Sequence, residues 1–70
     1  MSKVLENRVM KMVREDAPNA YTVTDLSGYL AQTYTRHVTD ASIERYAFAT
    51  LELIDRGELV YGTFGVVELP

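Results

Sequence analysis

The chain has 70 residues, a formal net charge of −3, one histidine and no cysteine. This length predicts a single domain with one small core, and the lack of cysteine excludes disulfides and thiolate metal sites. A zinc site built on His37 would need carboxylates for its other ligands, and no apolar run approaches the roughly 18 residues of a membrane span. We therefore expect a cytoplasmic protein without metal, cofactor or membrane partner.

The first predicted element is a helix over residues 3–15. One helical face carries a regular set of apolar residues, namely Leu5, Val9, Met12 and Val13. Val4 and Met10 lie off that face, so together with Tyr61 or Phe64 they predict a second apolar contact and a homodimer. The helix holds four basic against two acidic residues and is the basic part of the chain. This charged pattern differs from that of a signal peptide.

A short extended segment and a second helix follow. Residues 20–22 predict one short strand, and Thr22 is placed to cap a helix over residues 23–33. Asp25 stands three positions later, where its carboxylate could reach back to the Thr22 N–H as in a capping box.

Two sets of residues could form the core face of this second helix. Leu26 could point inward with Leu30 and Tyr34, or with Tyr29 and Thr33. Gly28 inside the helix predicts close packing of another helix at that point, since glycine otherwise costs helix stability.

A loop over residues 35–38, with Val38 filling the core, leads to the longest predicted helix, at residues 39–56. Thr39 is a suitable N-cap, and Gly57 suits the left-handed position that ends a helix. A helical wheel predicts a core face of Ile43, Tyr46, Ala47, Thr50, Leu51, Leu53 and Ile54. Phe48 falls among the polar residues. It would either pack under the second helix or the hairpin, or remain exposed as an anchor for a partner protein.

Residues 58–61 and 66–69 predict two strands. They are joined through residues 62–65, which begin and end with glycine, and this arrangement favours a β-hairpin.

This order of elements resembles the winged helix-turn-helix superfamily. The segments that carry the resemblance are TVTDLSGYLAQTY and HVTDASIERYAFATLELIDRGELVYG, and the similarity in order covers almost the whole chain. It implies an α+β fold with three helices and a C-terminal hairpin, the wing, with a third short strand near residues 20–22. It also implies that helix 39–56 enters the major groove of double-stranded DNA while the wing touches the adjacent backbone.

Carried over to this chain, the resemblance identifies four DNA-binding candidates. Arg45 would contact a guanine, and Ser42, His37 and Arg36 would meet phosphates or bases. However, the wing over residues 59–69 has no basic residue, and Glu44 and Glu52 lie on the same helix as Arg45.

The resulting prediction is a DNA-binding transcriptional regulator that works as a dimer. The alternative is an acidic winged-helix module that binds a protein, through Phe48, Glu44 and Glu52, and does not bind DNA. Such a module could be an assembly subunit or a small phage-type inhibitor of a host protein.

The chain shows no recognisable catalytic motif. Ser27, Ser42 and His37 could be imagined as nucleophile and base, but no glycine-rich elbow or phosphate loop accompanies them. We therefore do not expect an enzyme.

Overall fold

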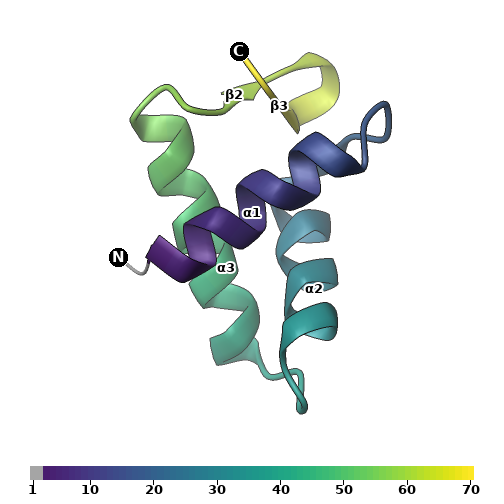
Figure 1. The fold of residues 1–70 in the computed structure, drawn as a ribbon, viewed down its shortest axis with the longest axis vertical. Coiled ribbons are helices and arrows are strands. Elements are labelled where there is room, and N and C mark those ends of the chain that lie inside the picture. The colour runs from purple at the N-terminus through teal and green to yellow at the C-terminus, as the bar shows by residue number, and fades with distance from the viewer. Residues whose placement is uncertain (1–2) are drawn as a thin grey trace.

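The computed structural model describes residues 3–70. In chain order its elements are α1 (Lys3–Glu15), β1 (Tyr21–Thr22), α2 (Val23–Tyr34), α3 (Asp40–Asp55), β2 (Val60–Tyr61), a short 3-10 turn η1 (Thr63–Gly65) and β3 (Val66–Glu68). Three helices and a C-terminal hairpin, joined by the short strand at residues 21–22, confirm the predicted α+β, winged-helix-like fold (Figure 1).

The helices form the body of the molecule, and α1 crosses α2 and α3 on one side (Figure 1). The hairpin lies at the end opposite the α2–α3 loop. The core between these elements is built from Val9, Leu26, Leu30, Ala31, Tyr46, Ala49, Leu53, Leu59 and Val67. Every helix and the hairpin segment contribute to it, so the fold depends on contacts between segments far apart in the chain.

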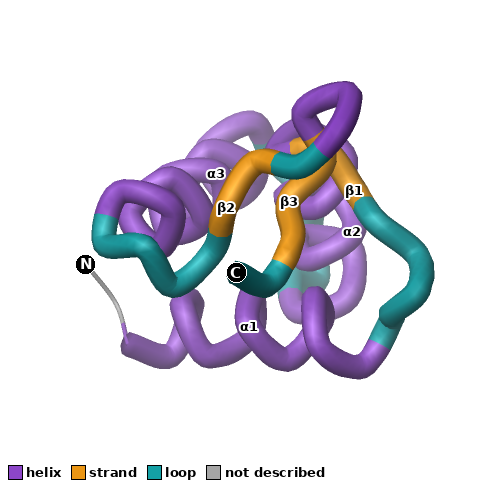
Figure 2. Tube along the Cα trace, turned by 90° about the horizontal axis from the view of Figure 1, so that it is seen from above, coloured by secondary structure: helices purple, strands orange, loops and turns teal. Residues whose placement is uncertain are grey.

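The three strands form one small antiparallel sheet in the order β1–β3–β2 (Figure 2). Tyr21 of β1 and Tyr61 of β2 both stand opposite Val67 of β3. Val67 is buried, so the central strand closes the core at this end. The short β1 predicted at residues 20–22 is thus what joins the helices to the wing.

The predicted helix boundaries are confirmed by their caps. Thr22 Oγ1 accepts a hydrogen bond from the Asp25 N–H at 3.2 Å, although in residues 3–70 the Asp25 carboxylate makes no return bond. At the start of α3, Thr39 Oγ1 accepts from the Ser42 N–H at 3.1 Å and Ser42 Oγ accepts from the Thr39 N–H at 3.0 Å. This reciprocal capping box was not predicted. Gly57 ends the helix at φ +79°.

The predicted core face of α3 is partly wrong. Leu51 is 42% exposed, and the buried residues are Ser42, Tyr46, Ala49, Thr50 and Leu53. Small side chains occupy much of the buried face, and they let α2 approach α3 closely. The Thr50 hydroxyl is satisfied there by the Tyr46 carbonyl at 2.8 Å. A helical wheel ranks the faces of a helix by hydrophobicity, to which serine, alanine and threonine contribute little. It therefore misses a buried face made of such residues.

Other core predictions also need correction. Val38 is exposed and does not fill the core. Of the two faces predicted for α2, only Leu26 and Leu30 are buried, together with Ser27 and Ala31, while the tyrosines at 29 and 34 are exposed. A Cβ at Gly28 would meet no atom within 4 Å, so no helix packs closely there.

Candidate interaction surface on α3

The outward side of α3 carries a row of exposed residues with a mixed character. We call five of them the acidic–apolar stripe: Glu44, Phe48, Leu51, Glu52 and Asp55. Phe48 is three or four positions away from Glu44, Leu51 and Glu52, and Asp55 is three or four positions away from Leu51 and Glu52. Such spacing places neighbours one turn apart on the same face of a helix. Phe48 therefore lies between Glu44 and Glu52 and next to Leu51.

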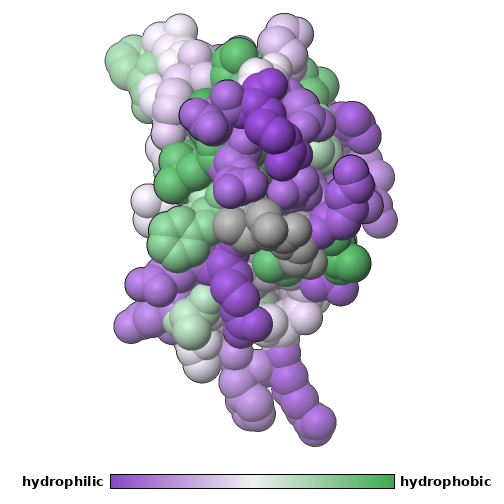
Figure 3. All heavy atoms as spheres, turned by 90° about the vertical axis from the view of Figure 1, so that its left-hand side faces the viewer, coloured by the Kyte–Doolittle hydropathy of each residue, from purple (hydrophilic) through white to green (hydrophobic). Residues whose placement is uncertain are grey.

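Phe48 is 53% exposed. The prediction that it packs beneath α2 or the hairpin is therefore wrong. The side chain is exposed, as the alternative requires, and its role as an anchor for a partner protein stays a prediction. Figure 3, which views the α3 side of the molecule, shows apolar side chains set among polar ones on this face. An exposed phenylalanine beside an exposed leucine leaves apolar area in water that a partner could bury.

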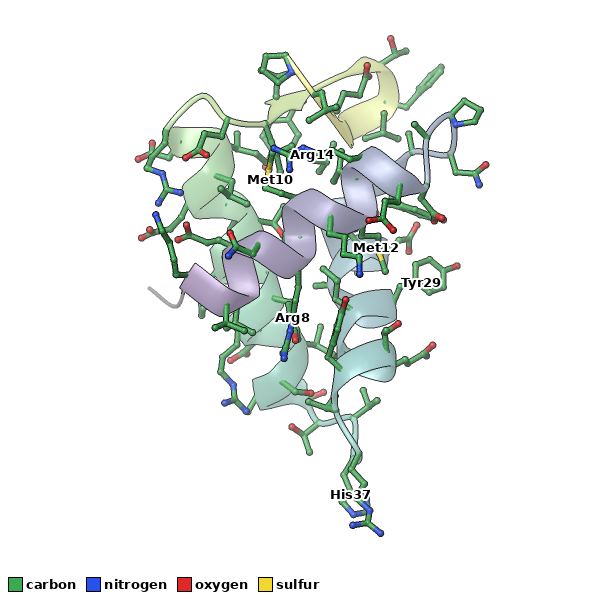
Figure 4. All side chains as sticks on the ribbon, viewed as in Figure 1. Arg8, Met10, Met12, Arg14, Tyr29 and His37 are labelled. Carbon is green, nitrogen blue, oxygen red and sulfur yellow. The ribbon has the colours of Figure 1, made fainter. Side chains whose placement is uncertain are left out.

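Of the residues predicted to contact DNA, some are exposed and one is buried. Arg36 and His37 are exposed in the α2–α3 loop. Figure 4 shows His37 at the tip of the molecule farthest from the hairpin. Ser42 is buried, and its hydroxyl donates to the Thr39 carbonyl at 2.8 Å and accepts from the Thr39 N–H. The prediction that Ser42 contacts DNA is wrong, because the capping box occupies its side chain.

Arg45 is exposed and, with Arg8 of α1, lines a pocket of about 130 Å³. Arg8 was missed by sequence reasoning. Its position could have identified it, since it lies three residues after Leu5 and four before Met12 on the inward side of a basic helix. Its guanidinium donates from Nη1 to the Tyr46 hydroxyl at 2.9 Å and stacks over the Tyr34 ring at 4.3 Å.

Another arginine, Arg56, stabilises the fold through ion pairs within the protein. It forms a bidentate pair with Glu6 of α1, with Nη2–Oε1 at 2.6 Å and Nη1–Oε2 at 3.2 Å, and its Nε donates to Glu58 at 2.9 Å. The Arg56 hydrogen bonds hold the pKa of the Glu6 carboxyl below its usual value, against the opposing effect of burial. This arginine therefore has little charge to offer a nucleic acid.

The wing offers no positive charge. The charged residues of the hairpin segment are both acidic, Glu58 and Glu68. Phe64 at its tip is 95% exposed and adopts a left-handed conformation at φ 62°. The wing can thus contribute an aromatic ring to an interface, but it cannot neutralise phosphate.

The two serines considered as nucleophiles instead form hydrogen bonds to backbone carbonyls in or beside the helices. The Ser27 hydroxyl donates to the Thr24 carbonyl at 2.9 Å, and Ser42 caps α3. Across residues 3–70, no group of three or more histidine or acidic side chains is placed to hold a metal ion. In the same part of the chain, no helix combines the length and apolar character needed to cross a membrane.

Comparison of the chain with protein-family models, curated proteins and solved structures finds no match.

Proposed function

We propose that this domain binds another protein through the acidic–apolar stripe of α3. The observation that carries the proposal is the position of Phe48, half exposed on the helix between two carboxylates. Aromatic side chains of this kind are typical anchors of protein interfaces. The matching partner surface has an apolar pocket for Phe48 and Leu51, with basic residues around it that pair with Glu44, Glu52 and Asp55.

The charge of α3 supports a protein partner over DNA. Its exposed residues include four acids, Asp40, Glu44, Glu52 and Asp55, and one base, Arg45. Most of the non-specific affinity for DNA comes from neutralising phosphates with basic residues. An acidic helix beside an uncharged wing tip repels the backbone that a recognition helix must approach.

The test compares capture by the wild-type domain with capture by Phe48→Ala, using lysate of the native cell. The matched control is Tyr29→Ala, which removes an exposed aromatic ring of α2, away from the stripe. Once a partner is purified, Phe48→Ala should weaken its binding by about 2 kcal/mol or more, roughly 30-fold. Tyr29→Ala should leave the affinity unchanged. A partner that binds wild type and Phe48→Ala equally would show that the stripe is not the binding surface.

DNA binding remains a second candidate, because the fold is winged-helix-like and Arg36, His37 and Arg45 lie around the start of α3. Selection from a pool of random duplexes tests it. Enrichment of one duplex, with a loss of about 1–3 kcal/mol in Arg45→Ala, would favour a DNA reader. Only two to four phosphates could be neutralised, so log affinity should fall against log salt with a slope of about −2 to −4. No binding to the pool at about 0.15 M salt is the result expected for the protein-binding domain.

A further inference from the structure

A pocket between α1, α3 and the residue after α2 is lined by two arginines and by no acidic residue. It is lined by Leu5, Arg8, Thr35, Ser42, Arg45 and Tyr46, and we call it the arginine pocket. None of these residues is acidic. In the described part of the chain, the ion pairs of arginine all belong to Arg56, so neither Arg8 nor Arg45 has a carboxylate partner. Two arginines therefore line one small site, and their like charges repel unless an anion joins them.

Arg8 is held in place with most of its donors unused. A guanidinium has five N–H groups in its plane. One of them reaches the Tyr46 hydroxyl, and the Tyr34 ring covers a face of the group, not its edge. The remaining in-plane donors have no acceptor among residues 3–70. Figure 4 shows Arg8 extending from α1 away from the hairpin, toward the end of the molecule that carries His37.

Tyr46 adds a buried donor to the same pocket. Its side chain is 2% exposed, and its hydroxyl oxygen accepts from Arg8. The hydroxyl proton finds no acceptor in the part of the chain that the structure describes. The two other hydroxyls are already directed to backbone carbonyls, Thr35 to Ala31 and Ser42 to Thr39. The unused polar groups of the pocket are therefore predominantly donors, which is the chemistry of an anion site.

We propose that the arginine pocket binds a phosphate group. Arginine forks match the oxygens of phosphate, and charge-assisted bonds of this kind are among the strongest in proteins. Two arginines at one site favour a dianion over a monoanion, because two positive charges attract a doubly charged anion more strongly. The pocket of about 130 Å³ suits one such group and lies below the ~300 Å³ at which sites for larger organic ligands begin.

This site is separate from the acidic–apolar stripe, and its residues do not include Phe48 or any of the carboxylates of that surface. The two proposals can therefore be tested independently. The arginine pocket could bind phosphate even if the stripe binds no protein, and the stripe could bind a protein even if the pocket binds no phosphate.

The experiment is a titration of the whole chain followed by ¹H–¹⁵N spectra at constant ionic strength, with orthophosphate as the probe. Saturable shifts are expected at the Arg8 Nε–H and at the backbone amides of Thr35 and Tyr46. Arg45→Ala should weaken binding about tenfold or more, because it removes one of the two charges. The control is Arg36→Ala, an exposed arginine of the neighbouring loop that does not line the pocket, and it should bind like wild type.

A second pair of variants keeps the test meaningful if one protein folds poorly. Tyr46→Phe retains the buried ring and removes the donor, and Arg8→Lys retains the charge and removes the planar fork. Both should bind orthophosphate more weakly while the rest of the spectrum remains that of the folded protein. Loss of phosphate response in Arg45→Ala but full affinity in both of these variants would overturn the assignment of the pocket.

Two further probes define the ligand. O-phosphoserine that binds like orthophosphate identifies a phosphate monoester on another molecule as the occupant, and binding of orthophosphate alone identifies the free ion. Dimethyl phosphate carries one charge, as the DNA backbone does, and should bind about tenfold more weakly. Equal affinity for dimethyl phosphate and orthophosphate, or no saturable shift into the ~10 mM range, would contradict the proposal.

Discussion

Glu6 and Arg56 show how a single pair of residues can join the ends of a small domain. They are 50 positions apart, and their bidentate contact links α1 to the end of α3. Glu6 is 6% exposed, so its charge is shielded from water and depends on the arginine. Arg56 also reaches Glu58 at the start of the hairpin segment. The pair thus orients helices and wing together.

Removing the Glu6 charge should change how stability depends on pH. The folded-state pKa lies below the ordinary 4.5 because Arg56 donates to the carboxylate. A lowered pKa stabilises the fold at pH values above 4.5, and this contribution is lost as the pH falls through the folded-state pKa. Wild type should therefore melt higher than Glu6→Gln at neutral pH, and the difference should shrink at acidic pH.

Thermal melts of both proteins from about pH 7 down to about pH 3 make the comparison. Glu15→Gln is the matched control, since Glu15 is an exposed carboxylate of the same helix with no ion pair within residues 3–70. It should follow the wild-type curve. A gap between wild type and Glu6→Gln that stays constant over the whole range would contradict the role given to the pair.

At the scale of elements, α3 is the helix whose two faces are hardest to tell apart from its sequence. Apolar residues occur on both sides of it. Tyr46 and Leu53 face the core, whereas Phe48 and Leu51 face outward. The buried side is decided by where α2 comes to rest, and the small residues Ala49 and Thr50 permit that contact.

Two leucines of α3 should respond differently to truncation. Leu53 is 1% exposed, so Leu53→Ala should cost about 2–5 kcal/mol through lost contacts and a cavity. Leu51→Ala should cost about 1 kcal/mol or less, because the side chain is already partly in water. Chemical denaturation of both variants measures the difference. Equal losses would mean that the outward face of α3 is covered in the folded protein.

The fold as a whole could be predicted to a large extent from local signals. Helix caps at Thr22 and Thr39, the glycine after α3 and the hairpin glycines are all features of short segments, and the structure confirms them. The candidate interaction surfaces could be predicted only in part. The arginine pocket and the Glu6–Arg56 pair join residues distant in the chain, and no local pattern contains that information.

The homodimer remains a prediction, but the structure changes which residues could form its contact. Met10 is partly buried and packs against the core, whereas Val4, Tyr61 and Phe64 are exposed. We expect self-association at micromolar or higher concentration through the aromatic residues of the wing. Phe64→Ser should weaken it without loss of core packing, since Phe64 is 95% exposed.

Sedimentation equilibrium over a series of concentrations tests this expectation. The wild-type mass should rise above that of one chain as concentration increases, and the rise should be smaller for Phe64→Ser. Tyr29→Ala removes an exposed ring of α2 and should behave like wild type. A mass of one chain at every concentration would exclude the dimer.

The sheet ends in two outer strands, β1 and β2, that are only two residues long. Unpaired backbone groups on an outer strand can recruit a strand from another molecule, and natural proteins limit this hazard by keeping such strands short. Here each open edge offers too few N–H and C=O groups to hold a second chain in register. Fibril growth from the folded state therefore lacks a template, and amyloid formation by this protein would require the helices to open first.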